Sequence, residues 1–337
     1  MMPHAGRVRI KLAVAIVMVI ATFAGNVCAQ SNPYRVDESW HLQLPEGRKL
    51  GGVIGVEFDR KGNLWIFERC GATVPGSCAD SKLSPIMEFD PSGKLLKSFG
   101  EGMFVSPHGF HVDKDDNIWA SDNGVKDGKG HQVIKFSPEG KVLLRLGKAG
   151  ATGDGENSFN APTDITVTRN GDVLVADGHG GETNQRVAKF SKDGKFIKTW
   201  GRKGSAPGEF NALHALALDS KGRLFVGDRS NSRIQIFDQD GKFLAEWKQF
   251  GRPSGIFIDA KDTIYVTDDE SDEKNNPGMK KGIRIGSAKD GTVTAFIPVL
   301  GPQDKPLTVT EGITADKMGN VYGAETTTTN VRKYVRN

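Results

Sequence analysis

Apolar and polar residues alternate along most of the chain in short runs that turn residues separate. A typical unit starts at His108 with an alternating run, turns at Asp113, and opens a second apolar run at Ile118. Alternation with a period of two is typical of half-buried β-strands, and the Asp-x-x-Gly/Asp pattern favours a tight turn. Two further runs follow at 131–136 and 141–146. Each unit therefore predicts four short antiparallel strands.

The same unit occurs six times in one register, with copies that start 40 to 57 residues apart. The copies start at Ile54, His108, Thr163, His214, Ser254 and Glu311, and they turn at Asp59, Asp113, Thr168, Asp219, Asp259 and Asp316. Repeats of this length with four strands each are typical of propeller blades. We predict an all-β, six-bladed β-propeller, because the alternative, a β-sandwich, does not require six copies in register.

The two ends of the chain suggest how the ring closes. The last unit ends with 330–335 and lacks a fourth strand, whereas residues 39–44 form an alternating run that belongs to no unit. We expect this N-terminal strand to complete the last blade, since that pairing removes an exposed strand edge. Residues 30–337 then form a single propeller domain.

The first 29 residues have the layout of a secretory signal peptide. Arg7, Arg9 and Lys11 precede an apolar run at 12–25, and a small-residue cleavage site ends at Ala29. The run is shorter than the roughly 20 residues that span a bilayer, so we expect cleavage near Ala29, no membrane span, and a secreted or periplasmic protein. Removing these residues lowers the formal net charge from +4 to +1. Such a balance disfavours nucleic acid as a partner.

The remaining composition is that of a globular protein rich in turns. The chain has 42 glycines among 337 residues and 37% hydrophobic residues, which disfavours a helical bundle. The predicted mature chain contains two cysteines, Cys70 and Cys78. In an oxidising compartment we expect them to form a disulfide; a metal pair or two free thiols are the alternatives.

The first strand of each blade lines the central channel of a propeller, so the six starting residues should meet at one rim. Alternate blades bring His108, His214 and Glu311 to the axis. Two imidazoles and a carboxylate are the ligand set of a catalytic zinc site. The alternative is a channel mouth whose polar residues are simply hydrated. His111 and His131 lack this placement, and we assign them no role.

Three further side chains are expected near the same rim. Arg69 and Arg229 end the second strands of blades one and four, and His179 follows the second strand of blade three. An arginine can clamp a carboxylate, and a histidine can exchange a proton with a substrate hydroxyl. A structural salt bridge is the alternative for each. For Arg229, the stretch 228–236 is also typical of a motif in which arginine and asparagine tie loops together.

Two other features bear on the chemistry. Residues 267–282 form a polar, acid-rich excursion, which we interpret as a solvated loop over the channel because the regular ligand spacing of a calcium loop is missing. No phosphate-binding glycine loop, Gly-x-Ser-x-Gly elbow or His-Glu-x-x-His helix is present. Serine-hydrolase and dinucleotide chemistries therefore have no support.

Several stretches resemble known propellers. The sequence 228–237 resembles the signature of NHL repeats. The stretches 107–119, 161–178, 207–218 and 226–229 resemble, in order, the peptidyl-α-hydroxyglycine α-amidating lyase domain, and the similarity runs from about Gly51 to the C-terminus. That family has a six-bladed propeller fold and removes glyoxylate from a peptide whose C-terminal glycine carries an α-hydroxyl.

The resemblance also implies site residues. Of the three zinc-binding histidines of the family, two positions hold His108 and His214, and the third holds Glu311. Arg69 and Arg229 would hold the carboxylate and the developing charge, while His179 stands where the family has a tyrosine, in a longer loop. The family's structural calcium implies the backbone carbonyls of Val56 and Phe110, with Gly312 in place of the family's aspartate.

We therefore expect a zinc-dependent, amidating-lyase-like propeller that cleaves a C–N or C–O bond in a hydroxylated carboxylate, with a small-molecule or peptide substrate at the channel rim. One alternative is a non-catalytic NHL propeller that binds a protein, peptide or glycan. The other is a metal-dependent lactonase-like hydrolase.

Overall fold

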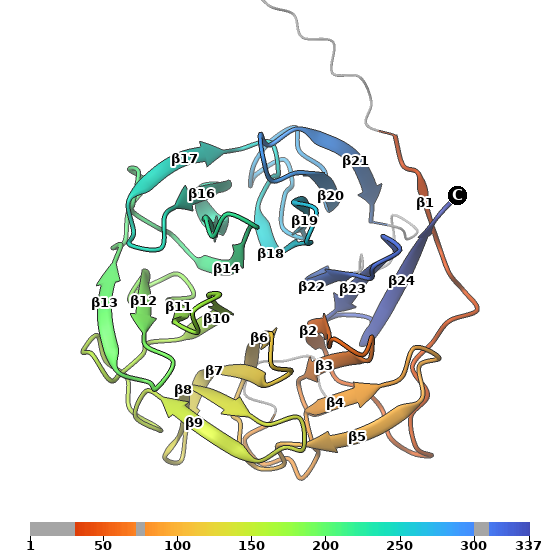
Figure 1. The fold of residues 1–337 in the computed structure, drawn as a ribbon, viewed down its shortest axis with the longest axis horizontal. Helices are drawn as coiled ribbons and strands as arrows, with labels where there is room; N and C mark the ends of the chain where they lie inside the picture. Colours follow the sequence, from red (N-terminus) through yellow and green to blue (C-terminus); the bar gives the residue numbers. More distant parts are fainter. Residues whose placement is uncertain (1–30, 72–77, 300–309) are drawn as a thin grey trace, which may run out of the picture.

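Six four-stranded antiparallel sheets surround a central channel as the blades of a propeller (Figure 1). The computed structural model describes residues 31–71, 78–299 and 310–337. The predicted fold class is confirmed, whereas the predicted signal peptide 1–29 lies outside the described residues. Within that part of the chain the only helical element is the 3-10 turn Arg229–Asn231, and no helix there is long and apolar enough to cross a membrane.

The strands form four concentric layers. The innermost strands are β2 (Val53–Phe58), β6 (Pro107–Val112), β10 (Pro162–Val167), β14 (Leu213–Leu218), β18 (Pro253–Ile258) and β22 (Thr310–Ala315). The second strands are β3 (Leu64–Glu68), β7 (Ile118–Lys126), β11 (Val173–Asp177), β15 (Leu224–Asp228), β19 (Thr263–Asp268) and β23 (Val321–Glu325). The third strands are β4 (Ile86–Phe89), β8 (Lys129–Phe136), β12 (Arg186–Phe190), β16 (Arg233–Phe237), β20 (Gly282–Ser287) and β24 (Asn330–Arg336). The outer strands are β5 (Leu95–Phe99), β9 (Val142–Leu146), β13 (Phe196–Trp200), β17 (Phe243–Trp247), β21 (Val293–Pro298) and β1 (Tyr34–Val36).

The repeat register of the sequence is the strand register of the structure. Each predicted turn joins the first two strands of a blade. In the five turns that start with an aspartate, its carboxylate accepts backbone N–H bonds from the residues two and four positions further on, whereas the turn of blade three starts with Thr168. At Asp59 the donors are Lys61 and Asn63, and the bonds recur at Asp113, Asp219, Asp259 and Asp316. The turn residues thus satisfy the backbone where the chain reverses.

The ring closes where the two ends of the chain pair. Strand β1 lies antiparallel to β24, with Tyr34 opposite Arg336 (Figure 1). The predicted N-terminal closure is confirmed, but its location is corrected, because the paired strand is Tyr34–Val36 and not 39–44. The alternation in 39–44 has another cause: Trp40, Leu42 and Leu44 pack against the junction of blades six and one.

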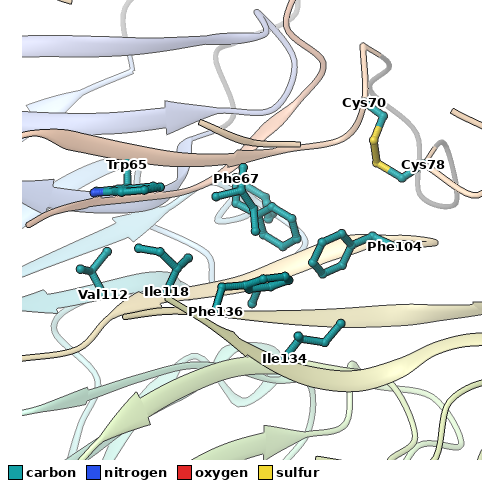
Figure 2. Packing of buried hydrophobic residues seen from close by; sticks show 12 residues of the cluster. Trp65, Phe67, Cys70, Cys78, Phe104, Val112, Ile118, Ile134 and Phe136 are labelled. Carbon is teal, nitrogen blue, oxygen red and sulfur yellow. A yellow bond between two sulfur atoms is a disulfide. The ribbon is translucent and has the colours of Figure 1, made fainter. Parts of the chain in front are cut away.

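The hydrophobic core is divided into six clusters, each lying between two neighbouring blades. Between blades one and two, Phe67 packs edge-on against Phe104 with ring centroids 4.9 Å apart, and Phe136 lies beside them (Figure 2). The disulfide between Cys70 and Cys78 borders the same cluster (Figure 2). The predicted pairing of the two cysteines is thereby confirmed.

A buried carboxylate lies on the second strand of every blade, at the last residue of the strand in five blades and within the longer strand β7 in blade two. These residues are Glu68, Asp122, Asp177, Asp228, Asp268 and Glu325, and each is at most 1% exposed. Four of them pair with an arginine of the third strand, in the pairs Arg186–Asp177, Arg233–Asp228, Arg284–Asp268 and Arg332–Glu325. Several also accept backbone N–H bonds from the loop before the inner strand, as Asp228 does from Asn211 at 2.7 Å. They anchor the loops from which the channel rim is built.

The closure generates the first prediction. Replacing Tyr34 by alanine should lower the free energy of unfolding by about 3 kcal/mol, because its ring is 4% exposed within the cluster between blades five and six. Its neighbour Arg35 is exposed, so Arg35→Ala is the matched control and should change stability by less than about 0.5 kcal/mol. Urea denaturation measures both, and equal effects would contradict the inferred role of β1.

The buried Asp122 generates a pH prediction. Burial raises its pKa to about 6, against hydrogen bonds from the backbone N–H groups of Ser106 and Val105 that act to lower it. Because the folded-state pKa is above the unfolded one, this group stabilises the fold at low pH, and about 3 kcal/mol should be lost as pH rises from about 4 to about 6.

The test compares urea denaturation of the wild type and Asp122→Asn between pH 4 and pH 7. The stability advantage of the wild type over this variant should shrink as pH rises, since the asparagine does not titrate. Asp127→Asn, at an exposed position of the same hairpin, is the control and should show no such trend. A constant difference across this pH range contradicts the assignment.

Candidate functional site

The six starting positions of the repeat converge in the channel. Together they line one cavity of about 250 Å³, to which all six inner strands contribute: Ile54, His108, Thr163, His214, Ser254 and Glu311. The sequence register therefore predicted correctly which residues meet. Their shared rim is the end of the channel at which the inner strands begin and the second strands end.

His108 and His214 are held in one tautomer by the backbone. Nδ1 of His108 lies 2.8 Å from the carbonyl oxygen of Thr163, and Nδ1 of His214 lies 2.6 Å from that of Ser254. A carbonyl only accepts, so both Nδ1 atoms carry the proton and both Nε2 atoms have a lone pair. Burial and nearby positive charges hold the pKa of both imidazoles well below the usual value. Neither Nε2 has a hydrogen-bond partner among the described residues.

A third histidine joins these two. His179, in the loop after β11, has its ring centroid 4.8 Å from that of His108 and 5.2 Å from that of His214. One ligand atom from each of the three lies within 4.8 Å of the others, and no second group of three potential metal ligands occurs in the described ranges. Burial, with Arg229 and Arg69 nearby, lowers the pKa of His179 to about 4. All three imidazoles are therefore neutral at physiological pH.

Glu311 lies on the same rim but outside this group of three. Its Oε2 is 3.9 Å from a guanidinium nitrogen of Arg69 and has no hydrogen bond in the described structure. Glu311 interacts electrostatically with Asp269. Burial and the charge of Glu311 raise the pKa of Asp269 to about 7. The Ser254 hydroxyl donates a hydrogen bond to Asp269 Oδ1. The role of Glu311 as a zinc ligand stays a prediction, and the geometry favours His179 as the third imidazole.

Arg229 faces the site, whereas its neighbours in sequence do not. Its guanidinium lies 3.3 Å from Glu270 Oε1 and 3.5 Å from His179 Nε2. Asn231 and Arg233 instead donate to the buried carboxylate of Asp228. The loop-tying motif expected in 228–236 is therefore carried by Asn231 and Arg233, and Arg229 is left available to the rim.

Sequence reasoning missed Arg252. It precedes β18 by one residue, is 8% exposed, and places a guanidinium nitrogen 2.7 Å from Glu270 Oε2. Its position is two residues before Ser254, so the repeat phase already indicated the correct rim. The ring of carboxylates was also missed, although an acid recurs fourteen positions after every repeat start.

The calcium site implied by the resemblance lacks its carboxylate ligand, because residue 312 is glycine in this chain. Val56, Phe110 and Gly312 all line the cavity. A Cβ added to Gly312 would lie 2.5 Å from the carbonyl oxygen of Ile54, so the close packing of blades six and one leaves no space for an aspartate there. The calcium stays a prediction.

The other polar features are structural. His111 forms an ion pair with Glu57 across blades one and two at 3.2 Å. His131 contacts the Asn123 carbonyl at 3.1 Å and the Thr152 hydroxyl at 3.0 Å. In the excursion after β19, which spans 269–281, Asp269 and Ser271 are buried while 272–275 are exposed. The predicted solvated loop therefore begins at residue 272, after a buried start.

The donor set fits a metal ion. Buried nitrogen lone pairs without partners are costly unless a ligand is present. Imidazoles whose Nδ1–H bonds to a carbonyl are the usual arrangement around zinc, because that bond fixes the ring and directs Nε2 to the metal. Among the described residues, the Nε atoms of Arg229 and Arg252 and Oε2 of Glu311 also lack hydrogen bonds. Unpaired hydrogen-bond acceptors of the histidines and Glu311 and unpaired donors of the two arginines thus lie on the same channel rim.

Comparisons with known proteins agree with the repeat analysis. The family model described as NHL repeat matches residues 210–237, which cover β14 to β16. The peptidyl-glycine alpha-amidating monooxygenase of Mus musculus is 38% identical over 53% of this chain and 20% of its own length. The peptidyl-alpha-hydroxyglycine alpha-amidating lyase 1 of Drosophila melanogaster is 34% identical over 56% of this chain and 37% of its own length.

Among solved structures, one described as a streptogramin B lyase is similar with a TM-score of 0.57 and 15% identity, covering 90% of this chain and 98% of the other. At that identity the likeness concerns the fold alone. The matched regions span much less than two thirds of the curated relatives named above. The resemblance to NHL propellers and to amidating lyases is nevertheless confirmed.

Proposed function

We propose that this chain is a metal-dependent, amidating-lyase-like enzyme that cleaves a C–N or C–O bond in a hydroxylated carboxylate substrate. The observation that carries the proposal is the pair of buried imidazoles, His108 and His214. Their Nε2 atoms have no hydrogen-bond partner in the part of the chain that the structure describes, and they lie beside a third imidazole. The relatives named as amidating lyase and monooxygenase support the reaction class.

The metal ligands in this proposal are His108, His179 and His214, and the metal is zinc because three neutral imidazoles with an open position are a common catalytic zinc set. Bound zinc supplies a Lewis acid that lowers the pKa of a substrate hydroxyl. The third imidazole comes from position 179, which the family fills with tyrosine, while position 311 holds a carboxylate. Two departures from the family pattern thus compensate each other.

The chain's own groups account for orientation and proton transfer. Arg69 and Arg229 attract the substrate carboxylate. The Asp269–Glu311 pair takes the hydroxyl proton; a C=O bond forms, the C–N bond breaks with its electron pair moving to nitrogen, and the proton is returned there. A carboxyl whose pKa lies at about 7, as for Asp269, is suited to both transfers. The products are an α-keto acid or aldehyde acid and an amide.

The enzyme acts outside the cytoplasm in this proposal. Two features support it: the signal peptide predicted at 1–29 and the disulfide between Cys70 and Cys78, a bond that forms in oxidising compartments.

Zinc content tests the ligand set. After equilibration with micromolar zinc and desalting, the wild type should hold about one zinc per chain, and His108→Ala, His179→Ala and His214→Ala should each hold less than about a tenth of that. Glu311→Gln should keep its zinc. His41→Ala, at an exposed position, is the control for a general histidine effect.

Two results would contradict this set. Zinc far below one per chain in the wild type overturns the metal-dependent proposal. Zinc kept in His179→Ala and lost in Glu311→Gln assigns the third ligand to the carboxylate that the repeat phase predicted.

Turnover tests the reaction. A peptide ending in α-hydroxyglycine should yield glyoxylate and the peptide amide, and His108→Ala should lower kcat/KM by at least about a hundredfold. Glu311→Gln should lower kcat with little change in KM, since its role is proton transfer. Glyoxylate assay and chromatography measure both products. Turnover of a simple lactone instead favours the hydrolase alternative, and no turnover of either favours a binding propeller.

A further inference from the structure

One group on the rim is an ion-paired carboxylate that no step of the proposed reaction uses. Glu270 places Oε1 3.3 Å from Arg229 and Oε2 2.7 Å from Arg252, so its two oxygens bridge two guanidinium groups. The two arginine side chains are 9% and 10% exposed, whereas that of Glu270 is 35% exposed. We call Arg229, Arg252 and the space between them the arginine clamp.

From this arrangement we infer that the arginine clamp is a carboxylate-binding subsite and that Glu270 is its displaceable intramolecular occupant. The inference rests on the proposed function, in which Arg229 already attracts the substrate carboxylate. It adds Arg252 as a second arginine that binds this carboxylate, and Glu270 as the residue that competes with it. Two converging guanidiniums are the arrangement with which proteins bind a carboxylate by charge-assisted hydrogen bonds.

The clamp offers more donors than Glu270 uses. The Nε atoms of both Arg229 and Arg252 are buried and have no hydrogen-bond partner within residues 31–71, 78–299 and 310–337. Within the clamp, two guanidinium groups share the single carboxylate of Glu270. An incoming carboxylate can therefore bind donors that Glu270 does not use before Glu270 leaves the clamp.

Exchange needs only a side-chain rotation. Asp269 on one side of Glu270 accepts from the Ser254 hydroxyl, and Ser271 on the other side is bonded to Asp268 through both its N–H and its hydroxyl. The backbone is thus anchored on both sides, while the partly exposed Glu270 side chain can turn to water at small desolvation cost. The buried arginines cannot do so and require a counter-ion.

The clamp adjoins the three histidines. Arg229 reaches within 3.5 Å of His179 Nε2, so a carboxylate bound in the clamp has its α-carbon substituents directed to the neighbourhood of that ring. A ligand that carries both a carboxylate and an adjacent hydroxyl matches this spacing of a clamp and a metal-binding group. The competing Glu270 then selects against neutral ligands, which gain nothing by displacing it.

The experiment titrates the metal-free protein with N-acetylglycine and with its uncharged counterpart N-acetylglycinamide in a low-chloride buffer, followed by calorimetry or NMR. Glu270→Gln should bind N-acetylglycine about tenfold more tightly than the wild type, because the competing charge is gone. Arg252→Lys should bind it about tenfold more weakly. Glu273→Gln, an exposed glutamate of the same loop, should match the wild type.

The outcomes are decisive in both directions. Glu270→Asp keeps the negative charge but has a side chain shorter by one methylene group. Its affinity for N-acetylglycine should lie between those of the wild type and Glu270→Gln. Thermal denaturation verifies that each variant is folded. The inference is overturned if folded Glu270→Gln binds no more tightly than the wild type, if neither binds, or if the amide gains as much as the acid.

Failure of this inference can be distinguished from failure of the proposed function. The titration uses metal-free protein and measures no turnover. If the protein binds N-acetylglycine selectively but holds no zinc and shows no turnover, the clamp is supported and the lyase proposal is wrong. If the protein holds zinc and shows turnover but Glu270→Gln binds N-acetylglycine no more tightly than the wild type, the lyase proposal is supported and the clamp inference is wrong.

Discussion

The ring of buried carboxylates on the second strands of the six blades is the constraint on which the site depends. In a propeller the loops at the channel rim have no strand partner to hold them, so something must satisfy their backbone groups. Asp228 does so for its blade by accepting the N–H of Asn211 and by binding Asn231 and Arg233. The residue that follows such a carboxylate is therefore fixed in position, and in blade four that residue is Arg229.

Burial then determines the charge of the rim. The same absence of water that makes a charged carboxylate costly keeps His108 and His214 neutral. Three arginines and three acidic residues surround these histidines, so the imidazole lone pairs lie among charges that nearly balance. These residues are Arg69, Arg229, Arg252, Asp269, Glu270 and Glu311. A charged ligand that enters this region takes the place of a protein group in an ion pair. Its affinity therefore depends more on the difference between the old and the new ion pair than on the apolar area that it buries.

The sequence was most informative where the repeat phase applied. It placed the strands of each blade and the convergence of His108 and His214, because both follow from a register that six copies repeat. It expected His179 near the same rim as a proton-transfer group but did not count it among the metal ligands, because that residue lies in a loop whose length departs from the repeat and whose path depends on packing. The paired strand at 34–36 was missed for a similar reason: Trp40 and its neighbours alternate like a strand while serving a blade junction.

The pairing of Tyr34 with Arg336 has a consequence for biosynthesis. Strand β24 supplies the partner of β1, so a growing chain cannot close its ring until β24 has been synthesised. Until then blades one and six each present an open face, and the channel has no complete rim. Closing the ring is a contact of very high sequence separation, which makes it a slow, late event in folding. The rigidity of the whole ring therefore depends on a contact between two residues, Tyr34 and Arg336, that lie 302 positions apart in the sequence.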